Sequence, residues 1–257
     1  MTQHTLAGRR EDEVLWFQRR DTLKAAAAWV AMGGLPAAMA QQRSNVVEHV
    51  GDILLNGRRM FPQQTVQTGD QIQTGPGSRL VFVIGDAAFH VRQNSRLSVE
   101  RGATLNAVSL LRLLTGAVVS VFGRGSHRTI STPTLTAGIR GTGVYTEIMD
   151  DQGGRTYFCN CYGAVDVAAG PDRAFSQASY HQAFWGEPAA RNGRFIRPAN
   201  AINHTDEELE FLARLIGQRT AWQIAGKKGI KDGKGYMDDK AGQMHPAMTR
   251  PARPAGC

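Results

Sequence analysis

Two cysteines and two histidines in the second half of the sequence are the side chains best suited to shared chemistry. Cys159 and Cys161 lie two residues apart in a run that favours a β-strand, where alternate side chains point to one face, so both sulfurs should face the same way. His181 and His204 follow further along the chain. Thiolate and imidazole groups together form a soft ligand set suited to zinc or copper.

Three interpretations of this cysteine pair remain open. The first is a disulfide, which would be strained because an extended strand holds the two Cα atoms near the upper limit for bridging. The second is a metal site that Cys159 and Cys161 share with His181 or His204. The third is a pair of packed thiols with no cofactor, since one C-x-C is less specific than paired C-x-x-C motifs. Cys257 is a separate thiol at the end of the sequence.

Motifs for catalysis are missing from the sequence. It contains no G-x-S-x-G elbow, no H-E-x-x-H helix and no phosphate-binding loop. His90 lies between Phe89 and Val91, and we expect it to be a half-exposed strand residue rather than a general base. These observations predict a protein that is not an enzyme and needs no cofactor, with the cysteine pair as the alternative centre for metal or redox chemistry.

Residues 41–170 predict an all-β domain. Short apolar runs are punctuated by glycine, and helical periodicity is missing. Gly-Asp recurs at positions 51, 69 and 85, so a β-sandwich and a short β-solenoid both remain open. The expected strands are Ile53–Leu55, Ser78–Ile84, Ala87–Val91, Arg96–Val99, Ser109–Leu114, Ala117–Phe122, Arg128–Ser131, Val144–Met149, Arg155–Cys161 and Ala164–Val167.

The composition becomes polar after Gly170, which predicts a linker and one amphipathic C-terminal helix over residues 171–225. Thr205 and Glu208 have the spacing of a capping box, in which the hydroxyl accepts from the Glu208 amide and the carboxylate reaches back. Gly217 is the expected helix stop. Residues 226–257 are basic and predict a disordered tail.

Residues 1–40 have the order of a bacterial export signal. An arginine pair precedes an Ala-rich apolar run that ends in small residues at Ala38 and Ala40, which fit a signal peptidase pocket. The motif resembles the twin-arginine pattern, from which it departs at Thr22, in its key residues Arg19, Arg20, Leu23 and Lys24. We expect cleavage after Ala40 and a periplasmic location. A basic amphipathic helix in a cytosolic protein is the alternative.

The chain of 257 residues carries a formal net charge of +8, which favours acidic partners. Basic and aromatic residues are not interleaved on one expected face, and export removes the protein from cytoplasmic nucleic acid, so nucleic acid is not an expected partner. No apolar run has the length of a membrane-spanning helix, so we expect no stable membrane span in the mature chain.

A glycine-rich run predicts a sharp bend at Arg140, Gly141, Thr142 and Gly143. Glycine allows two backbones to approach closely, while the arginine and threonine supply hydrogen-bond donors. We interpret this run as a structural corner in which Arg140 satisfies buried carbonyls. A ligand site is the alternative.

Residues 51–167 carry an ordered series of motifs that resembles the FecR-type periplasmic domain. The motifs are Gly51–Gly57, Thr68–Ser78, Asn94–Leu97, Leu114–Val118, Ser131–Thr134, Ile139–Gly143 and Tyr162–Val167. The resemblance implies a non-enzymatic module that relays signals, often from an outer-membrane receptor to a membrane-spanning sigma-factor regulator. The sequence shows neither the cytoplasmic domain nor the spanning helix of that regulator. It therefore favours a free module that binds an envelope protein or a glycan.

Overall fold

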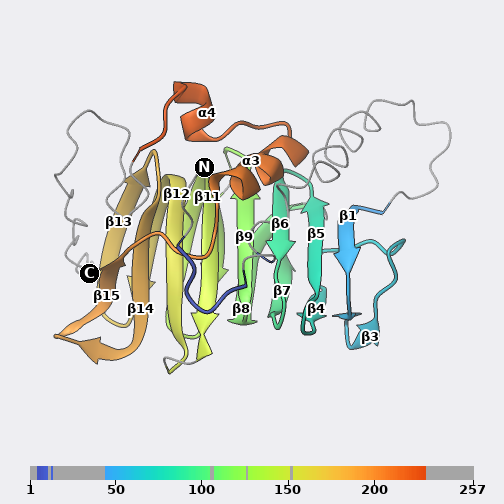
Figure 1. Ribbon diagram of the computed structural model, residues 1–257, viewed down its shortest axis with the longest axis horizontal. Coiled ribbons are helices and arrows are strands. Elements are labelled where there is room, and N and C mark those ends of the chain that lie inside the picture. Colours follow the sequence, from blue (N-terminus) through green and yellow to red (C-terminus); the bar gives the residue numbers. More distant parts are fainter. Residues whose placement is uncertain are drawn as a thin grey trace, which may run out of the picture.

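The structure, a computed structural model, describes residues 5–10, 13, 44–104, 107–125, 127–150 and 153–229. The predicted export motif, the predicted cleavage site, Cys257 and nearly all of the predicted tail lie outside these residues. The described chain is all-β, with two short helices near its C-terminal end (Figure 1). The elements are β1 (Val46–Val50), β2 (Ile53–Leu55), β3 (Arg58–Arg59), β4 (Gln71–Thr74), β5 (Arg79–Ile84), β6 (Ala87–Val91), β7 (Arg96–Arg101), β8 (Val108–Thr115), β9 (Ala117–Phe122), β10 (His127–Ser131), β11 (Thr136–Met149), β12 (Arg155–Ala169), β13 (Asp172–Ala178), β14 (Gln182–Arg191), β15 (Arg194–Ala199), α3 (Asp206–Leu215) and α4 (Ala221–Ala225).

All of these strands belong to one hydrogen-bonded sheet that divides into two arms at the β11–β12 hairpin. The first arm runs β1-β5-β6-β9-β11, and the second runs β11-β10-β8-β7-β4-β2-β3. Every described pairing is antiparallel except that of β8 with β10. The sheet therefore curls over on itself into two layers, without the repeated parallel rungs of a β-solenoid.

The sheet divides where β11 changes its neighbour. Its first residues, through Arg140, pair with β10, whereas the stretch from Gly143 to Glu147 pairs with β9. The register against β12 shifts between these two stretches, which marks a β-bulge. β12 changes its own neighbour nearby, from β14 at Asn160 to β13 at Gly163. The bulge thus directs one long hairpin into both layers.

The predicted corner at residues 140–143 is this bulge, but its arginine does not satisfy buried carbonyls. The Arg140 side chain is 56% exposed and pairs with Asp166 at 3.1 Å. Alternation along β11 turns Ile139 into the core and therefore turns Arg140 toward solvent. The buried donor is Thr142, whose hydroxyl donates to the carbonyl of Tyr162.

Alternation along the first arm produces two apolar cores. On β5, Leu80 and Phe82 join the core that lies between the two arms, while Val81 joins a second core on the opposite face. As a result β6 and β9 are buried along their whole length. The second core is covered by the C-terminal segment, which contributes Ile202, Leu209, Phe211, Leu212, Leu215 and Trp222. This segment, residues 200–225, is called the cap below, and it crosses the face of the sheet in Figure 1.

The cap contains the predicted amphipathic helix, α3, whose N-terminal capping differs from the prediction in one detail. The Thr205 hydroxyl accepts from the Glu208 amide at 3.3 Å, but the Glu208 carboxylate is used elsewhere, so only half of the predicted capping box forms. A complete capping box instead begins α4, with Thr220 and Gln223. Among the described residues, no helix has the length and apolar character needed to cross a bilayer.

The sequence predicts an irregular linker after Gly170, but the chain forms three further strands there, β13, β14 and β15. On β13 the buried positions hold the small residues Ala174, Ser176 and Ala178, while Phe175 is exposed. The exposed Phe175 breaks the apolar-in, polar-out alternation on which strand prediction depends.

Residues 5–10 also lie on the described domain, although the sequence assigns them to the leader. The Asn203 side chain accepts from the Ala7 amide at 2.5 Å and donates to the Ala7 carbonyl at 2.8 Å. Arg9 pairs with Glu147 at 2.8 Å. The start of the chain therefore contacts the same residues that begin the cap.

We predict that Gly163→Ala lowers the free energy of unfolding by more than about 2 kcal/mol. Gly163 has a φ of +101°, and an added Cβ would lie 2.6 Å from the Thr142 Cβ and 2.9 Å from the Gly141 carbonyl oxygen. Gly193→Ala is the matched control, because its φ is +73° but an added Cβ meets no atom within 4 Å. It should cost only about 1 kcal/mol. Urea denaturation measures both variants, and an equal loss of unfolding free energy in Gly163→Ala and Gly193→Ala would contradict the role assigned to the bulge.

Candidate functional site

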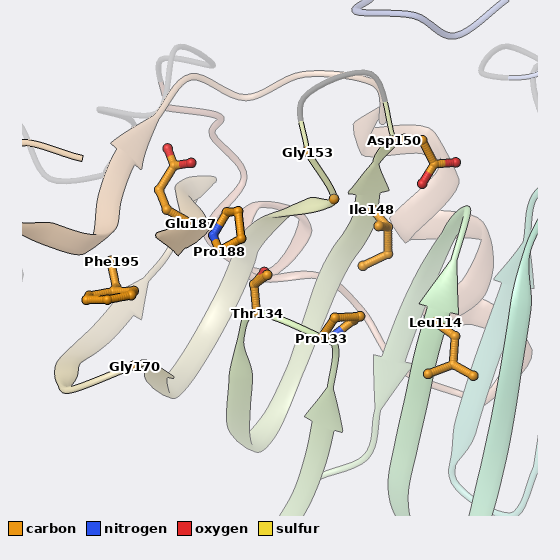
Figure 2. A pocket seen from close by; sticks show the side chains of 11 residues that line it. Leu114, Pro133, Thr134, Ile148, Asp150, Gly153, Gly170, Glu187, Pro188 and Phe195 are labelled. Carbon is orange, nitrogen blue, oxygen red and sulfur yellow. The ribbon is translucent and has the colours of Figure 1, made fainter. Parts of the chain in front are cut away.

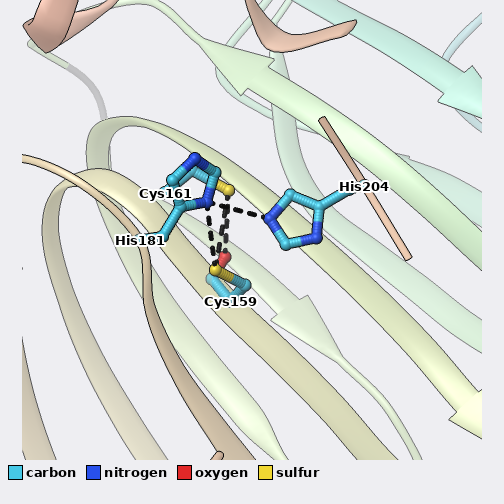
Figure 3. A group of neighbouring side chains, drawn as sticks. All are labelled: Cys159, Cys161, His181 and His204. Atoms are coloured by element: carbon cyan, nitrogen blue, oxygen red, sulfur yellow. Dashed lines mark hydrogen bonds between the residues drawn. The ribbon is translucent and has the colours of Figure 1, made fainter. Parts of the chain in front are cut away.

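Cys159, Cys161, His181 and His204 come together on the inner side of the cap (Figure 3). One sulfur or ring nitrogen from each lies within 4.8 Å of the corresponding atoms of the others. The two Sγ atoms are 3.8 Å apart, the Cys159 Sγ is 3.7 Å from the His181 Nδ1, and that nitrogen is 3.0 Å from the His204 Nε2. All four residues are buried. The structure therefore joins the two cysteines to both of the histidines that the sequence offered as alternatives.

Three segments of the chain position these side chains. Both cysteines lie on one face of β12, as strand alternation predicts, just before that strand changes its neighbour. His181 lies in the turn between β13 and β14, where its φ of +36° is unusual for a residue with a side chain. Its amide donates to the Cys161 carbonyl at 2.9 Å, which holds this turn against the cysteines. His204 lies just before α3.

Hydrogen bonds at the far side of each ring fix both imidazoles. The His181 Nε2 is 2.9 Å from an Asp206 carboxylate oxygen, and the other oxygen of Asp206 accepts from Tyr180 and Lys228, each at 2.8 Å. The His204 Nδ1 is 2.6 Å from the carbonyl oxygen of Ile202. Each ring therefore presents its remaining nitrogen to the cysteines.

Aromatic rings enclose the cluster. His204 stacks on Tyr145 with ring centroids 4.8 Å apart, and His181 stacks on Trp222 of α4 at 5.4 Å. Neither ring can turn without displacing a packed aromatic side chain. Tyr145 and Trp222 thus form walls of this site.

No disulfide joins Cys159 to Cys161 in the structure. Their sulfur separation of 3.8 Å is well beyond a disulfide bond of about 2.05 Å. Burial by itself raises the pKa of Cys159, but hydrogen bonds from Cys161 and the histidines and the charge of His204 outweigh it and bring that pKa well below the ordinary value of 9. The surroundings favour the thiolate, which is the form that binds metal.

A second buried polar group, which the sequence did not reveal, holds the cap to β6 and the residue after it. Arg92 donates to both carboxylate oxygens of Glu208, at 2.7 and 2.9 Å, and to the Asn203 carbonyl at 2.6 Å. The His90 Nδ1 lies 2.6 Å from Glu208. His90 is only 1% exposed, so the expectation of a half-exposed residue is wrong. Its partner lies more than a hundred residues away in the sequence, and no local pattern joins the two.

We predict that Glu208→Gln lowers the free energy of unfolding at pH 7 by about 3–5 kcal/mol, because the variant leaves the Arg92 charge buried without its partner. Burial opposes ionisation of Glu208, but Arg92 and His90 outweigh it and lower its pKa from 4.5 to about 2. This depressed pKa contributes stability above pH 4.5 that is lost as the pH falls toward 2. The difference in the free energy of unfolding between wild type and Glu208→Gln should therefore become smaller below pH 4.5.

Urea denaturation from pH 7 downward measures this difference. Glu100→Gln is the control, because Glu100 is 48% exposed in its pair with Arg112, and it should change stability by less than about 0.5 kcal/mol. If the difference in the free energy of unfolding between wild type and Glu208→Gln stayed constant as the pH fell, the assigned ion pair would be contradicted.

Comparison with known proteins relates the central strands to one family. The FecR protein family matches residues 70–166, less than half of the chain. No curated protein matches the chain. The fold is similar to two crystal structures described as an anti-sigma factor from Parabacteroides distasonis, with 12% and 14% identity and TM-scores of 0.42 and 0.43. The similarity covers 52% and 54% of this chain and 60% and 62% of theirs, so the chain spans about three-fifths of their length. Residues 70–166, which match the FecR protein family, are mostly β-strand, from β4 into β12.

Proposed function

We propose that the chain is an exported, non-enzymatic module that binds another protein of the cell envelope and passes on a signal through that contact. The observation that carries the proposal is the FecR match, which begins at Asp70 just before β4 and ends at Asp166 within β12. It thus takes in the bulge and strands of both arms. The arginine pair and apolar run of residues 1–40 support export.

Burial of the Cys/His cluster supports a role outside catalysis. Cys159, Cys161 and His181 have no exposed surface, and the cap covers them. A substrate would reach these groups only after the cap had left the sheet. Because catalytic groups must touch the substrate, this cluster is better suited to holding the fold together.

An open pocket at one end of the two layers offers a surface for the partner (Figure 2). It has a volume of about 560 Å³, and its apolar lining includes Leu114, Ile148, Pro188 and Phe195. Leu114 is 43% exposed, which is unusual for so large an apolar side chain. Glu187 is buried beside the pocket and pairs with three arginines. Apolar walls beside charged groups suit an apolar side chain of a protein partner better than a glycan.

We predict that replacing Arg19 and Arg20 together by lysine blocks export, because the twin-arginine pathway reads the guanidinium pair and not its charge alone. Fractionation and N-terminal sequencing should show wild-type protein outside the cytoplasm beginning at Gln41, and the variant as an intact precursor inside. Replacement of Arg58 and Arg59, an exposed arginine pair in β3, is the matched control and should leave export unchanged. Normal processing of the Arg19/Arg20 variant would refute this route.

We predict that a photoreactive benzophenone residue at Leu114 forms a covalent adduct with an envelope protein in intact cells, because Leu114 lines the pocket. The same residue at Phe61, which is 60% exposed but does not line the pocket, should give no such adduct. Mass spectrometry identifies the partner. Adducts of equal yield at both positions, or a glycan adduct at Leu114, would contradict a protein-binding pocket.

A further inference from the structure

We propose that Cys159, Cys161, His181 and His204 bind one zinc ion in a closed tetrahedral site that joins the cap to the sheet. The proposal does not depend on the partner proposed above. It rests on the outer hydrogen bonds of the two rings, the spacing of the four atoms, the charge of the group and the segments that it connects.

The outer hydrogen bonds determine where each ring carries its proton. A carbonyl oxygen can only accept, so the His204 Nδ1, 2.6 Å from the Ile202 carbonyl, carries a proton. Asp206 is paired with Lys228, so its carboxylate accepts from the His181 Nε2. The His181 Nδ1 and the His204 Nε2 are therefore the nitrogens left to face the cysteines, and they lie 3.0 Å apart.

The spacing of the four atoms is close to that of a zinc coordination shell. Zn–S distances of about 2.3 Å and Zn–N distances of about 2.0–2.1 Å in a tetrahedron place two sulfurs about 3.8 Å apart, sulfur and nitrogen about 3.6 Å apart, and two nitrogens about 3.3 Å apart. One distance of each kind is 3.8 Å, 3.7 Å and 3.0 Å here, and all four atoms lie within 4.8 Å of one another. Figure 3 shows the four atoms converging on one point.

The charges also balance. Two thiolates neutralise a divalent cation, so the loaded centre buries no net charge. Asp206 lies outside the centre, and its charge is offset by Lys228. A ligating histidine that donates its other nitrogen to a carboxylate or a backbone carbonyl is the usual outer shell of a protein metal site, and both forms occur here.

The ligand set selects zinc among the common ions. Two thiolates and two imidazoles in a tetrahedron favour zinc. All four positions are supplied by buried side chains of this chain, so no position remains for water or substrate. Closed sites of this kind are structural. The ion would connect β12, the turn before β14 and the segment before α3, and so fix the cap over the second core.

Metal analysis of the full chain, purified from zinc-replete cells and shown to be folded by circular dichroism, tests the proposal. We expect about one equivalent of zinc per chain, against less than about 0.1 equivalent in Cys159→Ser. Cys257→Ser is the matched control and should keep its zinc. Less than about 0.1 equivalent in the folded wild-type chain, copper in place of zinc, or a Cys159–Cys161 disulfide would overturn the assignment.

A second variant keeps the test decisive if Cys159→Ser fails to fold. Asp206→Asn leaves all four ligands in place but replaces the carboxylate that orients His181 with an amide. We expect this variant to bind zinc about 10–100-fold more weakly, as measured by competition with a chromophoric chelator. Glu207→Gln is its control, since Glu207 approaches the same Lys228 at 3.9 Å. Equal zinc affinity in Asp206→Asn and Glu207→Gln would refute the proposed coordination.

Discussion

The outer face of the first arm must be covered, and the structure depends on how the cap covers it. That face carries an apolar core together with a buried arginine and two buried histidines, His90 and His181. Apolar contacts alone would leave these polar groups without partners at a cost of several kcal/mol. The cap supplies both kinds of contact, since α3 brings Leu209 and Leu212 to the core and Asp206 and Glu208 to the buried cations and rings. Apolar packing and polar pairing therefore fix the same register of one helix.

The bulge in β11 has a separate consequence for the cysteines. Because β11 and β12 both change neighbours there, the long hairpin belongs to two layers, and the cysteines of β12 lie at the division. The turn that carries His181 leaves the sheet at the same level, since β13 and β14 pair with opposite halves of β12. The two sulfurs and the first imidazole are thus placed by the topology of the sheet. His204 arrives only when the cap docks, so the centre is complete only in the closed fold.

Local sequence patterns predict much of this architecture. The strands Ile53–Leu55, Ala87–Val91 and Ala117–Phe122 form with the predicted bounds, because glycine turns and short apolar runs define each of them. The C-x-C spacing correctly places two sulfurs on one face. The predicted strands Val144–Met149 and Arg155–Cys161 are parts of longer strands, because a bulge interrupts the apolar pattern without ending the strand. β13 to β15 escaped prediction because the exposed Phe175 breaks the alternation of β13, and glycine, proline and charged residues interrupt the short apolar runs of β14 and β15. The pairing of Arg92 with Glu208 depends on the tertiary fold, which no local pattern encodes.

X-ray absorption at the zinc edge of the full-length protein tests the central claim most directly, because it reports the atoms bound to the ion rather than its presence. The account predicts two sulfur neighbours at about 2.3 Å and two nitrogen neighbours at about 2.0–2.1 Å. A shell of nitrogen and oxygen atoms alone, as from zinc held loosely at surface histidines, would contradict it.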